Sequence, residues 1–458
     1  MNDPTGGEAR SFPEQGSIYR RIARNSALMA GGTAISSLFT MLAVALSARA
    51  LNAHDFGVLV LMQSAVLGLR GASSFATQQP VIKLGADAQA AEDRNRLGRI
   101  VSMGVVVDAA SSLVAFAVAA IAIKFFRGAL DLADRDVGFA WIFAGSLLFS
   151  AYPSSNGIFR LFNRFGVLAV IQVLSAIALF AAAIVLYAIH PTFEGFALAW
   201  AAYLAISGQA QLWSSLYLVS RDGSRLTLSR HVFRSEDGRT LLNYCWSTWG
   251  TSTADTVRAN GDSLMVGAIV SVQAAGVYNV ARQVAGVLRK FNMVYASTVF
   301  PEISKLAASG ASVAAVRLKK RMMWSGMAFG ILTVIAVALL APFFLPLVFG
   351  PRFASAYVPL LILIAAAMAQ LLSYTPSMYV QIYRSPQMLL ALTGIALVLF
   401  LASGISLTFA WGTAGMATAQ LVYALALMLL CEQALKSSAL NSRRTGRHAI
   451  AISQNERP

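Results

Sequence analysis

Apolar segments of about 20 residues recur along the whole chain and are separated by short polar segments. Each segment is long enough to cross a hydrocarbon core of about 30 Å as a helix. The seventh segment is the most polar, because three charged residues interrupt it. The pattern predicts an all-α polytopic membrane protein with about twelve transmembrane helices. Their expected positions are roughly 25–49, 56–79, 99–123, 138–159, 166–189, 194–219, 243–269, 276–299, 322–349, 354–379, 386–409 and 411–435.

Three sequence matches share nearly one offset and indicate an internal duplication. They pair Gly57 with Gly276, Ser150-x-x-Pro153-Ser154 with Ser373-x-x-Pro376-Ser377, and Gly195-x-Ala197-x-Ala199 with Gly415-x-Ala417-x-Ala419. The repeat unit has six spans, an even number, so both copies enter the membrane in the same direction. An axis along the membrane normal then relates them. The expected fold is therefore two six-helix bundles around a central cleft.

This duplication also predicts the division of the chain. The expected parts are an N-terminal tail at 1–24, a first six-helix bundle at 25–219, a linker at 220–242, a second bundle at 243–435 and a C-terminal tail at 436–458.

Charge decides the expected orientation. The chain is 57% hydrophobic and only 12% charged, with a net charge of +16. The basic residues lie mostly in short clusters between apolar segments, which argues against a nucleic-acid partner. With the N-terminus in the cytoplasm, 26 Lys and Arg residues face inward and 5 face outward. The positive-inside rule therefore predicts that both termini and the 220–242 linker are cytoplasmic.

Five basic residues lie inside predicted spans, where a lipid-facing cation costs about 2.5–3.5 kcal/mol on insertion scales. We expect them to line an electropositive cleft that binds an anionic substrate group. The alternative for the last two is that their side chains extend to the cytoplasmic interface. The five are Arg70, Arg258, Arg282, Arg289 and Lys290.

Acidic residues within spans are candidates for ion coupling. Asp255, Arg258 and Asp262 form one stripe of the seventh helix, which fits either an intrahelical ion network or a proton or cation site. Asp108 has no predicted partner within its own helix, so it is a third coupling candidate. Helix-breaking residues inside spans are either hinges or ordinary kinks. The hinge candidates are Pro153, Pro376 and Gly261.

The sequence offers little support for catalysis or a bound cofactor. It contains no Gly-Lys-Ser/Thr motif, so no P-loop ATPase is expected. Its four histidines are scattered, so no metal site is expected, and no nucleophile–base constellation appears. The two cysteines, Cys245 and Cys431, lie in or beside apolar segments and are expected to be free thiols.

Several motifs resemble one family of membrane proteins. They are Ser47-Ala-Arg-Ala-Leu-Asn-Ala-His-Asp-Phe-Gly57-Val, Gly261-Asp-Ser-Leu-Met-Val-Gly267, Ala275-Gly-Val-Tyr-Asn-Val-Ala-Arg282, Phe300-Pro301-Glu302, Phe349-Gly350-Pro-Arg-Phe-Ala354 and Gly412-Thr-Ala-Gly415-Met-Ala-Thr418. Together they resemble the polysaccharide-transport (Wzx-type) flippases of the multidrug/oligosaccharidyl-lipid/polysaccharide exporter superfamily. The resemblance covers nearly the whole chain. It implies a bacterial inner-membrane flippase for a polyprenyl-pyrophosphate-linked oligosaccharide, working by alternating access and coupled to H+ or Na+.

The implied partners are the lipid-linked oligosaccharide, membrane lipids, and a polysaccharide polymerase with its chain-length regulator. Three alternatives compete with this interpretation. A multidrug or cation antiporter of the same superfamily is disfavoured by the cationic spans, and a membrane polymerase or ligase is disfavoured by the short outward loops. A peptidoglycan-precursor flippase remains compatible with the residues.

Overall fold

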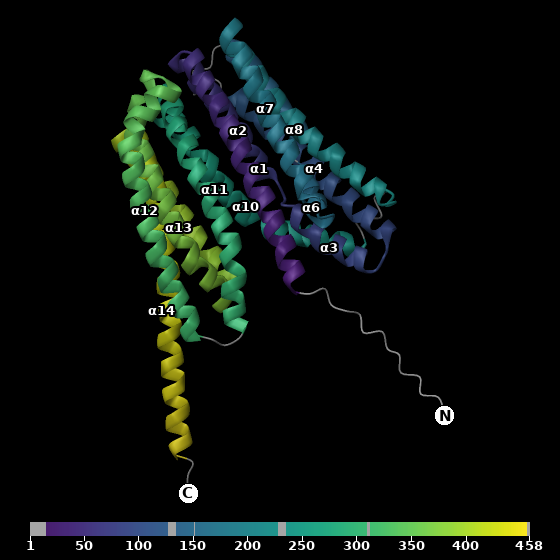
Figure 1. The fold of residues 1–458 in the computed structure, drawn as a ribbon, viewed down its shortest axis with the longest axis vertical. Coiled ribbons are helices and arrows are strands. Elements are labelled where there is room, and N and C mark those ends of the chain that lie inside the picture. Colours follow the sequence, from purple (N-terminus) through teal and green to yellow (C-terminus); the bar gives the residue numbers. More distant parts are fainter. Residues whose placement is uncertain (1–14, 127–133, 151, 228–234, 309–311, 456–458) are drawn as a thin grey trace.

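The computed structural model describes residues 15–126, 134–150, 152–227, 235–308 and 312–455, and these are almost entirely helical (Figure 1). Side chains are described for a smaller set, which excludes those of Asp255 and Lys290. The elements in chain order are α1 (Gln15–Ala50), α2 (Ala53–Ser73), α3 (Gln78–Ala90), α4 (Arg94–Phe126), α5 (Asp134–Ser150), α6 (Pro153–Leu161), α7 (Phe165–Ile189), α8 (Phe193–Arg221), α10 (Glu236–Ile269), α11 (Val272–Ala308), α12 (Ser312–Phe349), η1 (Pro351–Ala356), α13 (Tyr357–Tyr383) and α14 (Pro386–Asn455).

The helices follow the predicted spans, with three differences. The second span ends at Ser73, and a separate helix, α3, follows it. The fourth span is divided into α5 and α6, because Pro153 begins a new helix after Tyr152 leaves the helical conformation. The last two spans form one long element, α14, whose backbone turns at Gly412 (φ 57°). Only glycine adopts this left-handed conformation without steric cost.

Eight of the described helical segments are long and apolar enough to cross a membrane by length and composition. The predicted spans α8, α10 and α11 are not among the eight. Of these, α10 is rich in Thr, Asp, Arg and Asn. Polar side chains in such a helix are stable only where other helices or water surround them. The position of α10 inside the molecule meets this requirement.

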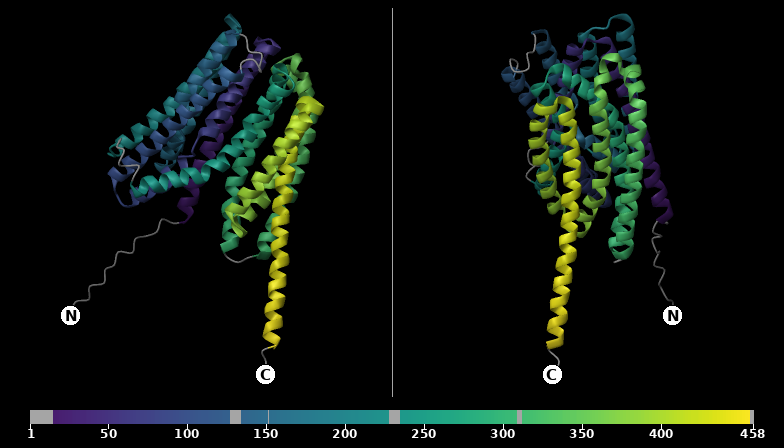
Figure 2. Two further views of the ribbon diagram at one scale, coloured as in Figure 1. Left: turned by 180° about the vertical axis from the view of Figure 1, so that it is seen from behind. Right: turned by 90° about the vertical axis from the view of Figure 1, so that its left-hand side faces the viewer.

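The helices form two lobes (Figures 1 and 2). The first lobe contains α1 to α8, and the second contains α11 to α14. Helix α10 lies between them and packs against both α2 and α14. The lobes meet at one end and diverge toward the end where the N-terminal side of α1 and the C-terminal side of α14 lie (Figure 2). The predicted all-α fold in two bundles is confirmed, whereas the exact bundle boundaries stay a prediction.

The lobes make a close contact where α2 crosses α11. A Cβ atom added to Gly57 would overlap the carbonyl oxygen of Val272. A Cβ added to Gly276 would lie 3.0 Å from Cδ1 of Phe56 and 3.4 Å from Cα of Gly57. Gly57 and Gly276 are the pair that the duplication makes equivalent. Equivalent residues meet close to a two-fold axis that relates two repeats, so this crossing fits the predicted duplication, and the direction of the axis stays a prediction.

Arginines join the two lobes at this closed end. The Arg49 guanidinium of α1 donates to the carbonyl oxygens of Leu347 and Val348, at 3.0 Å to the latter, in the last turn of α12. Arg352 of η1 donates to the carbonyl oxygen of Leu51 at 3.4 Å. Cations are favoured at the C-terminal ends of helices, where carbonyl groups lack helical partners. At the diverging end, no ion pair among the described side chains joins α1–α8 to α11–α14.

Candidate functional site

A network of buried polar groups surrounds Asp262 in α10. Its carboxylate is fully buried and accepts hydrogen bonds from Arg282 Nη1 at 3.0 Å and from the Tyr278 hydroxyl at 3.0 Å. Gln420 Nε2 of α14 and the Ser263 backbone N–H also donate to it, at 3.2 and 2.7 Å. Both carboxylate oxygens are therefore paired, which a buried charge requires. The network joins α10, α11 and α14.

Arg258 belongs to the same network through α14. Its Nη1 donates to Gln420 Oε1 at 3.0 Å, and Gln420 Nε2 donates back to the Arg258 carbonyl at 3.1 Å. Its guanidinium carbon lies 4.6 Å from the centre of the Tyr423 ring, in cation–π range. The Arg258 Nε has no hydrogen-bond partner among the described residues. Arg258 is thus held largely by contacts between helices.

This arrangement changes the expectation for the acidic stripe of α10. The predicted intrahelical network would pair Arg258 with Asp255 and Asp262. In the structure Asp262 pairs with Arg282 of α11, so the described part of the network runs between helices. Asp255 lies outside the described side chains. The sequence does contain signals for two further members, because Tyr278 lies in a family-like motif and Gln420 is a polar residue within an apolar span.

Arg70 and Arg289 differ from the paired arginines. Both side chains are partly buried, in α2 and α11 respectively, and neither makes a hydrogen bond or ion pair with a described residue. Arg289 lines a cavity with Gln420 and residues of α13, and the cavity volume of about 10 Å³ is close to that of one water molecule. Arg70 lies within electrostatic range of Tyr203 in α8. Neither arginine therefore has an acidic partner among the described side chains.

The structure brings together only part of the predicted cationic cleft. Arg258, Arg282 and Arg289 gather around Asp262 in the second lobe, and Arg70 lies in the first lobe. The side chain of Lys290 lies outside the described set. Arg282 is a paired structural cation here, so it is not free to bind substrate in this conformation. Among the described side chains, Arg70 and Arg289 make no hydrogen bond or ion pair, whereas Arg258 leaves only its Nε without a partner.

Asp108, a predicted coupling residue, has a structural partner on each oxygen. Thr77 Oγ1 donates to its Oδ1 at 2.5 Å, and the backbone N–H of Ser154 donates to its Oδ2 at 2.8 Å. Ser154 is the second residue of α6, so Asp108 supplies a carboxylate to the N-terminus of that helix. Negative charge stabilises this end of a helix. This geometry favours a capping role for Asp108 over ion coupling.

The hinge candidates occupy different kinds of position. Pro153 is the first residue of α6, where its missing N–H costs nothing. Pro376 lies inside α13 and Gly261 inside α10, and both helices continue through them. The sequence analysis did not single out Gly412 as a turn, although it stands in a family-like motif. No group of three potential metal ligands occurs among the residues whose placement is described.

A family model described as "Polysaccharide biosynthesis protein" matches residues 22–307, which is more than half of the chain. The protein belongs to this polysaccharide biosynthesis family. A curated relative, "Inner membrane protein YghQ" of Escherichia coli (strain K12), is 24% identical over 343 residues, covering 74% of this chain and 95% of the relative. The residues that match the family model include nearly all of the first lobe, all of α10 and nearly all of α11.

Solved structures confirm the fold. An inward-facing multidrug resistance MATE family transporter of the MOP superfamily matches with a TM-score of 0.71 at 13% identity, over 89% of this chain and 96% of that one. The lipid II flippase MurJ in an inward closed conformation matches with a TM-score of 0.67 at 14% identity, over 89% and 87%. The polysaccharide biosynthesis family member described here is therefore a multi-pass membrane protein with the fold of MOP-superfamily transporters.

Proposed function

We propose that this protein flips a polyprenyl-pyrophosphate-linked oligosaccharide across the bacterial inner membrane for the synthesis of a surface polysaccharide. Membership of the polysaccharide biosynthesis family supports the sugar, and the fold supports transport by alternating access. In this proposal the diverging end of the lobes faces the cytoplasm, as the charge bias predicts. The protein carries out no covalent chemistry.

The observation that carries the proposal is that Arg70 in the first lobe and Arg289 in the second make no hydrogen bond or ion pair with a described residue. A cation in the membrane interior is costly unless an acid, water or a ligand compensates it. Asp262 compensates Arg282, and Gln420 and Tyr423 contact Arg258, whereas no described residue pairs with Arg70 or Arg289. Guanidinium groups bind phosphate oxygens through paired, charge-assisted hydrogen bonds. A pyrophosphate held between the lobes would supply the missing negative charge.

The same cations disfavour a multidrug antiporter, because its cationic substrates would be repelled. A peptidoglycan precursor also carries a pyrophosphate, so the family match is what favours a polysaccharide unit over it. For coupling to H+ or Na+, Asp262 is the candidate among the described residues. Its protonation would remove the charge that holds Arg282 and would loosen α10 from α11.

The test is export of surface polysaccharide in a strain that lacks the gene, complemented by variants of the full chain. Arg70→Gln and Arg289→Gln are each expected to reduce polysaccharide at least tenfold, and to accumulate the lipid-linked unit in the inner membrane. Arg→Lys at either position should restore export partially, because Lys keeps the charge but loses the planar fork. All values are normalised to protein in the inner membrane.

The matched control is Arg317→Gln, which removes an exposed arginine of α12 that also lacks a described partner. It should export as the unmodified protein does. Wild-type export by both Gln variants at Arg70 and Arg289 would refute the role of these cations. An unchanged polysaccharide level in the null strain, combined with increased drug sensitivity, would instead support an antiporter.

A further inference from the structure

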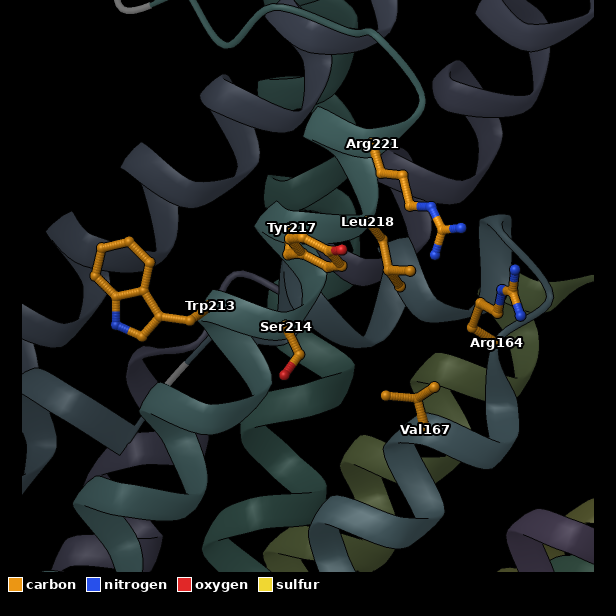
Figure 3. A pocket seen from close by; sticks show the side chains of 7 residues that line it. All are labelled: Arg164, Val167, Trp213, Ser214, Tyr217, Leu218 and Arg221. Carbon is orange, nitrogen blue, oxygen red and sulfur yellow. The ribbon is translucent and has the colours of Figure 1, made fainter.

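A cavity of about 460 Å³ lies between α7 and α8 at the diverging end of the first lobe, away from the Asp262 network. Two arginines border it: Arg164, directly before α7, and Arg221, the last residue of α8. Figure 3 shows both guanidinium groups on the same side of the lining residues, above Val167. The cavity is therefore charged at one end and apolar along its wall.

Neither arginine has a described partner for its charge. Both side chains are exposed, and neither makes a hydrogen bond or ion pair with any described residue. The other residues that border the cavity are aromatic, aliphatic or hydroxylic, and none is acidic. Two cations at one end of a cavity whose lining contains no acid can bind an anion. Guanidinium groups are well suited to phosphate, because they form paired hydrogen bonds with its oxygens.

An apolar stripe continues from this cavity along the membrane-facing side of α7. Val167, Val170, Leu174 and Ile177 follow each other at steps of three and four residues, and all are exposed. Such steps place side chains on one face of a helix. A hydrocarbon chain lying on this stripe would begin directly below the two arginines. Free phosphate has no apolar part that could contact this stripe.

Aromatic residues fix the level of the cavity in the membrane. Trp213 and Tyr217 of α8 border it and are 67% and 63% exposed. Exposed Trp and Tyr on membrane helices gather at the headgroup level, where their rings meet both apolar and polar surroundings. Val167 lies just inside α7, so the cavity stands where the helix enters the hydrocarbon. The position matches that of a lipid headgroup and not that of an aqueous solute.

We propose that this cavity binds the phosphate headgroup of an anionic phospholipid, with Arg164 and Arg221 on the phosphate and an acyl chain along the α7 stripe. The charge bias places the site in the cytoplasmic leaflet. The site is separate from the path assigned to the exported substrate. Its occupant joins the end of α8 to the start of α7 and so stabilises the diverging end of the first lobe.

The test is lipid retention by the purified full-length protein. The protein is released from nanodiscs of equal parts phosphatidylglycerol and phosphatidylcholine, and bound lipids are counted by native mass spectrometry. The unmodified protein should retain phosphatidylglycerol preferentially. The Arg164→Gln/Arg221→Gln variant should retain it about tenfold less, since each basic group near a membrane surface strengthens the binding of anionic lipid several-fold.

The matched control is Arg94→Gln/Arg225→Gln, which removes the same charge from exposed arginines at the same end that do not border the cavity. It should retain phosphatidylglycerol as the unmodified protein does. Equal loss in both double variants would show only a general charge effect and would overturn the proposal. Release of the lipid by millimolar inorganic phosphate would also overturn it, by showing an anion site without lipid specificity. A Trp213→Leu variant that folds and loses phosphatidylglycerol selectivity would strengthen it.

Discussion

Arg282 and Asp262 show how the second lobe accommodates charge in its interior. The carboxylate is fully buried, and it pairs with the guanidinium at 3.0 Å while Tyr278 and Gln420 fill its remaining positions. Removing one member of a buried ion pair leaves the other charge without compensation, which typically costs about 3–5 kcal/mol. We therefore expect these two residues to stabilise the fold, whereas Arg70 and Arg289 are the cations that we propose bind the substrate.

We expect Arg282→Gln to lower the melting temperature of the detergent-solubilised protein by several degrees, because it strands the Asp262 carboxylate. Asp262→Asn in the same chain should recover most of that loss, since the amide no longer needs a cation. Arg289→Gln serves as the comparison and should melt as the unmodified protein does. If Arg282→Gln alone melts normally, the pair does not stabilise this conformation.

Sequence analysis could identify these arginines but not their partners. A charged residue inside an apolar segment is visible directly, so Arg70, Arg258, Arg282 and Arg289 were all found. Pairing depends on how distant helices face each other. Gln420 is 162 positions from Arg258, and Arg282 is 20 positions from Asp262. The stripe on α10 predicts contacts within one helix. In the structure the described side-chain partners of Arg258 and Asp262 are instead residues of α11 and α14.

Among the elements, α2 and α11 carry the contact between the lobes. Their crossing depends on Gly57 and Gly276, because a larger side chain at either position would meet the other helix. The hydrophobic pattern predicted both helices and the equivalence of the glycines. It did not predict the end of α2 at Ser73 or the division of α5 from α6. Both depend on local backbone turns, and the pattern of apolar residues continues across these turns without a break.

Gly57→Ala is expected to destabilise the closed contact and to lower the melting temperature, because the added carbon overlaps the Val272 carbonyl. Forcing one extra carbon into a packed contact typically costs about 1–3 kcal/mol. Gly145→Ala is the control, since a Cβ there has no atom within 4 Å. That change should be neutral or slightly stabilising, as expected for Gly to Ala within a helix. Equal melting temperatures for the two variants would show that α2 and α11 can move apart at the crossing without loss of stability.

At the scale of the whole molecule, the lobes are joined at one end and diverge at the end that carries both chain termini (Figure 2). The positive-inside rule predicts that the diverging end is cytoplasmic. Arg49 and Arg352, which join the lobes, then belong to the periplasmic face. If the protein works by alternating access, as we propose, this structure is one of the two states that the cycle requires.

Single-cysteine labelling of whole cells tests this orientation. The background carries alanine at Cys245 and Cys431, two buried cysteines that form no disulfide in the described structure. An impermeant maleimide should label a cysteine at the exposed position Ala354 in η1 and should not label one at the exposed position Thr227. Permeabilised cells should label both. Labelling of Thr227→Cys in intact cells would reverse the topology and place both termini outside.

Arg70 and Arg289 also give the molecule a fixed positive charge within the electric field of the membrane. Moving one elementary charge across the whole field changes the free energy by about 2.3 kcal/mol per 100 mV. Any rearrangement that displaces these side chains along the membrane normal therefore responds to voltage. In the proposed function a bound pyrophosphate would neutralise them, so the loaded protein and the empty protein would experience different forces. The membrane potential would then act on the cations chiefly while the empty protein changes back to its starting conformation. Removing the membrane potential would change the rate of that step.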